Sequence, residues 1–319
     1  MRLAILLALL PLSAMADDRV DAALDQHILP GFARLVDSTA ALAASDDCAP
    51  IDAWAQASDA WQAVSHLRFG PTEVNNRGFA LAYWPDPRGA TPKALNTLLS
   101  ENAPAVADAS VAGRGVYAME FLLFDPAYPA SDARCALVQA LAADANNTAT
   151  AIAQDWNDRY AALLRDPTNA TYQSETEALQ ELYKSLQTGL EFTSDTRIGR
   201  PLGTFDHPRA SRAEMRRSDR SLNNVVVSLT SLQQLARALA SEDPDLTTEI
   251  DAAFDKAFAR ADEIATLEGG TDFSLVDDPQ NRLKLEVLQQ NIDAIRDLLA
   301  MKLGPQLGVS AGFNSLDGD

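Results

Sequence analysis

Apolar residues recur at three- and four-residue steps along most of this 319-residue chain, and this spacing restricts the fold more than any other feature. Residues 174–192 carry Leu179, Leu182, Tyr183, Leu186 and Leu190 at such steps, and residues 218–240 repeat the pattern. This period places the apolar side chains on one face of an α-helix. Further helices are predicted over 52–67, from Thr91 onward, and over 132–164, 246–267 and 279–303. Because alternating strand patterns are nearly absent, the chain is predicted to be all-α and packed as helical bundles.

Two Arg-x-Gly segments interrupt the helical pattern. One runs from Arg68 to Gly89 and the other from Arg197 to Arg209, and each contains proline and follows an amphipathic helix. Both are predicted to be loops, one in each half of an internally duplicated chain. The predicted division is therefore two four-helix-bundle-like domains, residues 17–167 and 168–319, which meet where Pro167 ends a long helical run.

The first sixteen residues have the composition of a secretory signal peptide. Arg2 supplies a positive start, residues 3–10 supply a short apolar run, and Ala14-Met15-Ala16 is a small-x-small cleavage site before Asp17. Residues 1–16 are therefore predicted to be removed, and no cysteine follows them that could carry a lipid anchor. No later segment is long and apolar enough to be a transmembrane helix. We expect an exported, periplasmic protein.

Two cysteines in an exported chain most simply form a disulfide, here Cys48 to Cys135. The formal charge of −19 disfavours nucleic acid as a partner, because phosphate binding depends on lysine and arginine. Converging carboxylates can instead attract cations, although an acidic surface is the simpler interpretation of this charge.

The familiar catalytic motifs of hydrolases and nucleotide-binding enzymes are missing from the sequence. There is no His-Glu-x-x-His, Gly-x-Ser-x-Gly or Cys-x-x-Cys, and the three histidines are His27, His66 and His207. His27 and His207 are expected in loops or at the surface. His66 is interpreted either as a residue that orders the following loop or as a ligand-binding residue.

Residues 113–124 contain one carboxylate, Glu120, in an otherwise apolar helix that should be buried. A buried carboxylate needs a counter-charge, a hydrogen-bond network or a bound cation. The expected counter-charge is Arg68 or Arg114. Tyr117 lies three residues before Glu120 and therefore on the same helix face. Tyr117 is either a half-buried aromatic residue or a second ligand.

These motifs together resemble the imelysin-like family. Gly115, Glu120 and the following Phe-Leu-Leu-Phe are similar to its Gly-x-His-x-x-Glu helix, with Tyr117 in the place of the histidine. The segments that match the family's other elements are His66 to Pro71, Tyr83 to Asp86, Arg197 to Gly203, and Gly312 to Asp319. The resemblance implies two related helical bundles, an envelope location, and a metal or ligand pocket near the Glu120 helix.

The resemblance leads to three competing hypotheses. The first is an envelope binding protein for iron or another divalent cation, or for a ligand that carries one, working with envelope iron-transport components. Its predicted pocket residues are Glu120, Tyr117, His66, Arg68, Trp84 and Asp86, with Glu120 and Tyr117 as metal ligands, since a phenolate suits Fe(III). The second is a metallopeptidase, which the scarcity of histidine disfavours. The third is an interaction module whose metal site has degenerated.

Overall fold

The computed structural model describes residues 18–101 and 105–309, and these residues are helical with no β-strand. The only ladder-type pairings among them are isolated bridges, Ala82 with Gly115 and Thr204 with His207. The all-α prediction is confirmed. The predicted signal peptide and the C-terminal segment from Gly312 to Asp319 lie outside the described residues.

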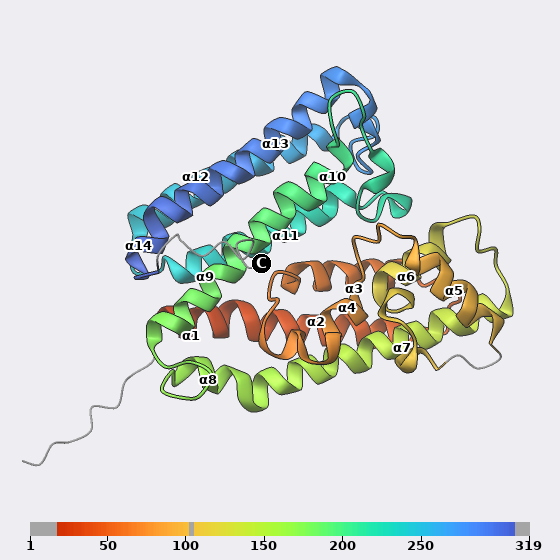
Figure 1. The fold of residues 1–319 in the computed structure, drawn as a ribbon, viewed down its shortest axis with the longest axis horizontal. Coiled ribbons are helices and arrows are strands. Elements are labelled where there is room, and N and C mark those ends of the chain that lie inside the picture. Colours follow the sequence, from red (N-terminus) through yellow and green to blue (C-terminus); the bar gives the residue numbers. More distant parts are fainter. Residues whose placement is uncertain (1–17, 102–104, 310–319) are drawn as a thin grey trace, which may run out of the picture.

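The first half of the chain forms the lower layer in Figure 1. The helices that pack around its core are α2 and α7, which lie side by side, with α3 against α2 and α6 against α7. The bounds in this half are α1 Asp18–Ala23, α2 Leu29–Ala43, α3 Ile51–Val64, α4 Arg77–Leu81, α5 Ala90–Ser100, α6 Gly115–Phe124, α7 Asp132–Asp155 and α8 Ala161–Arg165.

The second half forms the upper layer, where α12 packs between α11 and α13 and α9 contacts both α11 and α13. The bounds are α9 Glu175–Glu191, α10 Gly199–Leu202, α11 Ser221–Leu239, α12 Pro244–Ala265, α13 Pro279–Leu298 and α14 Gly304–Gln306. The loop predicted from Arg197 is wrong in its first part. A π-helical segment, Phe192–Ile198, continues α9 directly into α10, and the chain leaves the helix only at Gly203.

Side-chain caps explain where several long helices begin. Ser131, Ser174, Asp243 and Asp278 each accept a hydrogen bond from a backbone N–H in the first turn of the helix that follows. These residues satisfy donors that have no partner inside the helix. Proline follows Asp243 and Asp278 at the first helical position, where its fixed φ angle and missing N–H cost nothing.

The two halves meet where α11 packs against α3 and α1, and where α9 also contacts α1. The indole of Trp54, on α3, is fully buried, and Trp61 is only 3% exposed, so both tryptophans of this helix belong to the core. Gly189 allows α9 to lie close to the end of α3, because a Cβ atom there would lie 2.7 Å from the Cβ of His66. The domain division at Pro167 and the internal duplication remain predictions.

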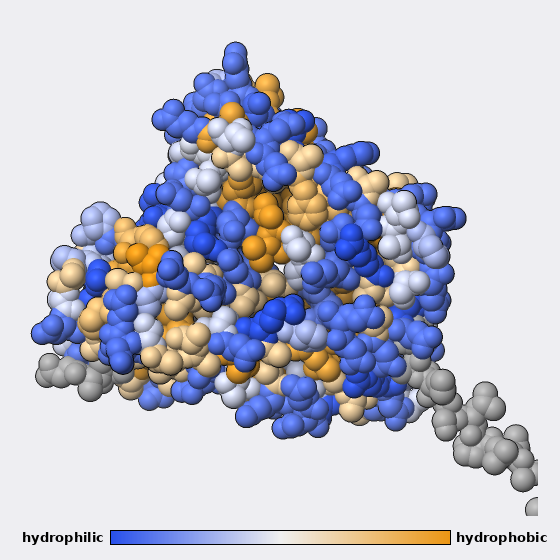
Figure 2. Space-filling view, turned by 180° about the vertical axis from the view of Figure 1, so that it is seen from behind, coloured by the Kyte–Doolittle hydropathy of each residue, from blue (hydrophilic) through white to orange (hydrophobic). Residues whose placement is uncertain are grey.

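Hydrophilic side chains cover most of the face shown in Figure 2, and apolar side chains gather near its middle. Among the described residues, no helix has the length and apolarity needed to cross a membrane.

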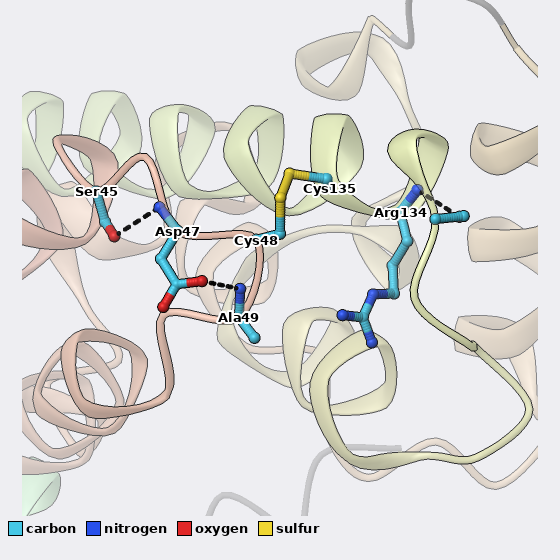
Figure 3. Close-up of a disulfide and its surroundings, with 7 residues drawn as sticks. Ser45, Asp47, Cys48, Ala49, Arg134 and Cys135 are labelled. Atoms are coloured by element: carbon cyan, nitrogen blue, oxygen red, sulfur yellow. Dashed lines mark hydrogen bonds between the residues drawn. A yellow bond between two sulfur atoms is a disulfide. The ribbon is translucent and has the colours of Figure 1, made fainter.

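The predicted disulfide is confirmed. Cys48 follows α2 and Cys135 lies in the first turn of α7, and their Cα atoms are 4.6 Å apart across 87 residues of sequence (Figure 3). The Cys48 segment is held by a turn in which the Asp47 carboxylate accepts a hydrogen bond from the N–H of Ala49 at 2.9 Å. The bridge therefore ties the end of α2 to the start of α7.

Opening this bridge is expected to lower the free energy of unfolding by about 3–5 kcal/mol, because the cross-link restricts a long loop in the unfolded chain. Guanidinium unfolding of the protein with and without reductant measures the change, and a Cys48→Ala/Cys135→Ala double variant is the matched control that reductant should not affect. Two free thiols in protein freshly purified from an exporting host would contradict the assignment.

Candidate functional site

Helix α6 carries the central residues of the site, and its geometry follows from its two ends. Gly115 has φ +71°, and a Cβ atom at this position would lie 2.0 Å from the carbonyl oxygen of Leu81. Only glycine permits this approach of α6 to the end of α4. Asp125 leaves the helix in an extended conformation because Pro126 follows it. The ten-residue helix is buried on most sides, as predicted.

The hydroxyl of Tyr117 lies inside a buried polar network rather than in open solvent. It donates a hydrogen bond to Oε1 of Glu214 and accepts one from Nε2 of Gln62 at 2.8 Å. Burial raises the pKa of Tyr117 well above its ordinary value, and the negative charge of Glu214 raises it further. The phenol is therefore held in its neutral form.

Glu214 is the charged centre of this network and is only 2% exposed. Its Oε2 accepts hydrogen bonds from Nε of Arg197 and from Nδ2 of Asn224, both at 2.9 Å. Arg197 in turn donates from Nη2 to Oε1 of Gln62 at 2.6 Å. We call these five residues, Gln62, Tyr117, Arg197, Glu214 and Asn224, the junction network, because its first two members come from the first half of the chain.

Arg197 reaches the network from the π-helical segment Phe192–Ile198. The wider π turn adds a residue to the helix and changes which side chains face inward, and such turns are frequent at functional sites. Nη1 of Arg197 donates to Oγ1 of Thr193 at 3.1 Å in the same segment. The Arg197 side chain is 4% exposed, and Nη2 also donates to Oγ of Ser65 at 3.2 Å.

Glu120 is held by a short 3₁₀ turn of the second half, Arg216–Ser218. Its Oε1 accepts hydrogen bonds from the N–H of Arg217 at 3.0 Å and from the N–H and hydroxyl of Ser218 at 3.2 and 3.0 Å. Burial raises the pKa of Glu120, although the charge of Arg217 and these hydrogen bonds oppose the shift. Among the described residues, no hydrogen bond reaches Oε2.

The prediction that Arg68 or Arg114 supplies the counter-charge of Glu120 is therefore wrong. Arg68 pairs with Glu73 at 2.6 Å, and Arg114 forms a bidentate pair with Asp144 at 2.9 and 2.8 Å. Both arginines already have partners within the first half of the chain. The charge and the donors that stabilise Glu120 come from the second half instead, at Arg217 and Ser218, which the sequence pattern did not single out.

Two cavities lie on either side of a partition formed by Trp84 and Tyr117, whose rings stack with centroids 6.5 Å apart. The first cavity, about 330 Å³, is bordered by His66, Arg68 and Arg197. The second, about 480 Å³, is bordered by Glu120. Both volumes are in the range of small-molecule sites, roughly 300–1,000 Å³.

The six predicted pocket residues are thus brought to one region but are divided between the two cavities. His66 and Arg68 line the first cavity, Asp86 and Glu120 line the second, and Trp84 and Tyr117 line both. Asp86 is already engaged by backbone donors, because its carboxylate accepts the N–H groups of Ala90 and Thr91 at 2.9 and 2.8 Å. Burial alone raises the pKa of Asp86, but these hydrogen bonds lower it overall. Asp86 therefore caps α5 beneath the cavity.

The expectation that His27 lies at the surface is wrong. His27 is 2% exposed, in the π-helical segment Leu24–Ile28, and its Nε2 lies 3.0 Å from Nε2 of His66. Burial, followed by the charge of Arg34, lowers the pKa of His27 to about 4. Burial also lowers the pKa of His66, and both His27 and Arg197 add to that shift. The pair is therefore neutral at neutral pH.

Several residues at the site were missed by the sequence analysis. They are Gln62, Arg197 as a buried residue, Glu214, Asn224, Arg217 and Ser218. One signal was available. Residues 197–220 hold seven arginines but only three acidic residues, in a chain whose acidic residues outnumber its basic ones by 45 to 26. Such a local reversal of charge marks a segment that serves something other than solubility.

A protein-family model and a solved structure both match this chain. The family model described as Imelysin (peptidase M75) matches residues 26–299, which is most of the chain. The protein belongs to the imelysin family. The crystal structure of an imelysin-like protein from Psychrobacter arcticum 273-4 superposes with a TM-score of 0.76. At 19% sequence identity, over 92% of this chain and 96% of that one, this likeness shows a shared fold. Among curated proteins, none matches the sequence.

The imelysin motif of this chain has a tyrosine where the resemblance leads us to expect a histidine, and this change alters the chemistry of the site. A neutral phenol that donates a hydrogen bond to Glu214 is a poor metal ligand, because ligation requires the phenolate. Glu120 fits a metal better, since Oε2 has no hydrogen-bond partner among the described residues and the residue borders the second cavity. Within the described ranges, no three His, Cys, Asp or Glu residues converge to form a metal cluster.

Replacing Arg197 with methionine is expected to cost about 3–5 kcal/mol of unfolding free energy, because Glu214 is then buried without its ion pair. The matched control is Arg237→Met, which breaks the pair with Asp251 on a side chain that is 48% exposed. That control should cost less than about 1 kcal/mol. Urea unfolding at pH 7 measures both, and equal losses would show that the junction network adds no stability beyond that of a surface pair.

The histidine pair predicts acid sensitivity. A histidine whose pKa is lowered in the folded state favours folding above its unfolded pKa, and this contribution is lost as pH falls toward the folded pKa. With a folded pKa of about 4 for His27, the protein should lose about 2 kcal/mol of stability from this residue between pH 7 and pH 5. Urea unfolding at both pH values should show a smaller loss for His27→Gln than for the control His207→Gln. The same loss in both variants would contradict the assignment.

Proposed function

We propose that this imelysin-family protein is a cell-envelope binding protein that takes a metal ion, or a small ligand carrying one, into the second cavity beside Glu120. The observation that carries the proposal is the state of the Glu120 carboxylate. One oxygen is fixed by three hydrogen bonds from the 216–218 turn, and the residue borders a cavity of about 480 Å³. A carboxylate held in this way is oriented before any ligand arrives.

The chemistry of Glu120 favours a cation as its partner. A buried carboxylate with a raised pKa gains from a nearby positive charge, because that charge stabilises its ionised form. Glu120 offers a single carboxylate, so a metal bound there takes its other ligands from water or from the small molecule. A ferric or divalent ion with oxygen ligands suits such a site.

Export to the periplasm is part of the proposal and rests on two features. Residues 1–16 have the composition of a signal peptide, and the Cys48–Cys135 disulfide is of the kind that persists in oxidising compartments. An envelope protein that binds iron or another metal would pass its ligand to transport components of the same compartment. We therefore propose envelope iron-transport proteins as its partners.

Changing Glu120 to glutamine tests the proposal. The amide oxygen can still accept the hydrogen bonds of the 216–218 turn, so the fold should survive while the charge on the cavity side is lost. Purified wild-type protein is equilibrated with Fe(III), Zn²⁺ and Cu²⁺, with and without citrate, and bound metal is measured by mass spectrometry. E120Q is expected to retain less than about one tenth of the wild-type metal.

The matched control for this experiment is Glu73→Gln, which removes a carboxylate of the same kind that pairs with Arg68. This variant should bind as much metal as the wild type. If wild-type protein takes up no metal in any form, or if E120Q binds as much as E73Q, the proposed function is wrong.

A second candidate, an interaction module with a degenerate metal site, is favoured by the junction network. Tyr117 and Glu214 satisfy each other within the protein, and Arg197 balances the charge of Glu214 without any bound ion. In that case the E120Q substitution changes the stability of the protein but has no effect on ligand binding. The metallopeptidase alternative needs a metal with an open position and a general base, and no feature of either cavity favours it.

A further inference from the structure

The second cavity is bordered by basic side chains as well as by the acidic Glu120. Arg200 and Arg212 both border it. In the described ranges neither guanidinium forms an ion pair, whereas Arg217 in the same cavity is bonded to Asp125 at 2.7 Å.

Arg200 is the more constrained of the two. Its Nε is buried and has no hydrogen-bond partner, and its guanidinium carbon lies 5.9 Å from the ring centroid of Trp84. Burial lowers the pKa of Arg200, and the like charge of Arg212 lowers it further. A buried donor without an acceptor and two guanidiniums that repel each other are both costs to the folded protein. An oxyanion placed between the two side chains would remove both costs.

We propose that Arg200 and Arg212 form an oxyanion-binding wall in the second cavity, which takes the carboxylate or phosphate groups of a small ligand. Arginine suits this role because its planar fork donates two parallel hydrogen bonds to such groups. A second step rests on the proposed function. The same two arginines indicate that the metal is bound as a complex with an anionic small molecule rather than as a bare ion. A metal complexed by a polycarboxylate or a phosphate would place its cation toward Glu120 and its free oxyanions toward the two arginines.

The charges of the cavity explain why a complex fits better than a bare ion. Arg200, Arg212 and Arg217 all repel a free cation, while Glu120 repels a free anion. A ligand that carries both signs meets each wall with the opposite charge. The oxyanion site is therefore expected to bind a metal-free anion weakly and its metal complex more tightly.

The test is isothermal titration of the mature protein with citrate, inorganic phosphate and Fe(III)-citrate. Arg200→Gln and Arg212→Gln should each weaken citrate binding by about tenfold or more, the usual effect of losing a charge-assisted hydrogen-bond partner. Arg209→Gln is the matched control, because Arg209 is an exposed arginine of the same segment that does not border the cavity. Arg212 is also exposed, so R212Q should keep the wild-type fold and melting temperature.

The outcomes separate this inference from the proposed function. Citrate affinity that is the same in R200Q, R212Q and R209Q, or absent in all proteins, overturns the oxyanion wall even if metal uptake still depends on Glu120. Arginine-dependent citrate binding in a protein that takes up no metal supports the oxyanion wall and overturns the proposed function. Arginine-dependent binding that is tighter for phosphate than for citrate supports the wall and assigns its ligand to the phosphates.

Discussion

The ion pair between Arg197 and Glu214 is the interaction on which the geometry of the site depends. Both side chains are buried, so each charge is tolerated only because the other is present. Gln62 and Tyr117 complete the hydrogen bonding of this pair from the other half of the chain. The junction network therefore positions α6 against the segment that follows α10. It also places Tyr117 as the shared wall of two cavities.

The two cavities differ in what they offer a ligand, although Trp84 and Tyr117 border both. The first is bordered by aromatic rings, by His66, and by Arg197 and Glu214, whose charges are paired with each other. The second has a carboxylate at Glu120 and two arginines without ion-pair partners. Oriented but unsatisfied polar groups favour the second cavity as the binding site, because a ligand can supply the missing partners. The tyrosine in the imelysin motif belongs to the junction network, and we therefore propose Glu120 as the residue of that motif that binds a ligand.

Helical periodicity predicted the all-α class and most of the long helices, since an apolar stripe is a local property of the sequence. The disulfide was predicted from the presence of two cysteines in a chain expected to be exported. The buried helix α6 with its single carboxylate was predicted from the apolar residues that surround Glu120. The partners of Glu120 did not follow, because Ser218 and Arg217 lie almost a hundred residues away and reach it only through tertiary packing. His27 and Arg197 were missed for another reason. Each lies in a π-helical segment, whereas the sequence pattern predicted a loop at Arg197 and a loop or surface position for His27, so neither side chain was expected to face inward.

The central claim is that a metal-bearing ligand lies between Glu120 and the arginines of the second cavity. Anomalous X-ray diffraction from crystals of the mature protein grown with Fe(III)-citrate tests it most directly, because the iron position is observed without assumptions about affinity. The account predicts one iron peak in the second cavity, at bonding distance from Oε2 of Glu120, with citrate oxygens on Arg200 and Arg212. An iron peak elsewhere on the protein, or iron bound in solution with Glu120 free of it in the crystal, would contradict the claim.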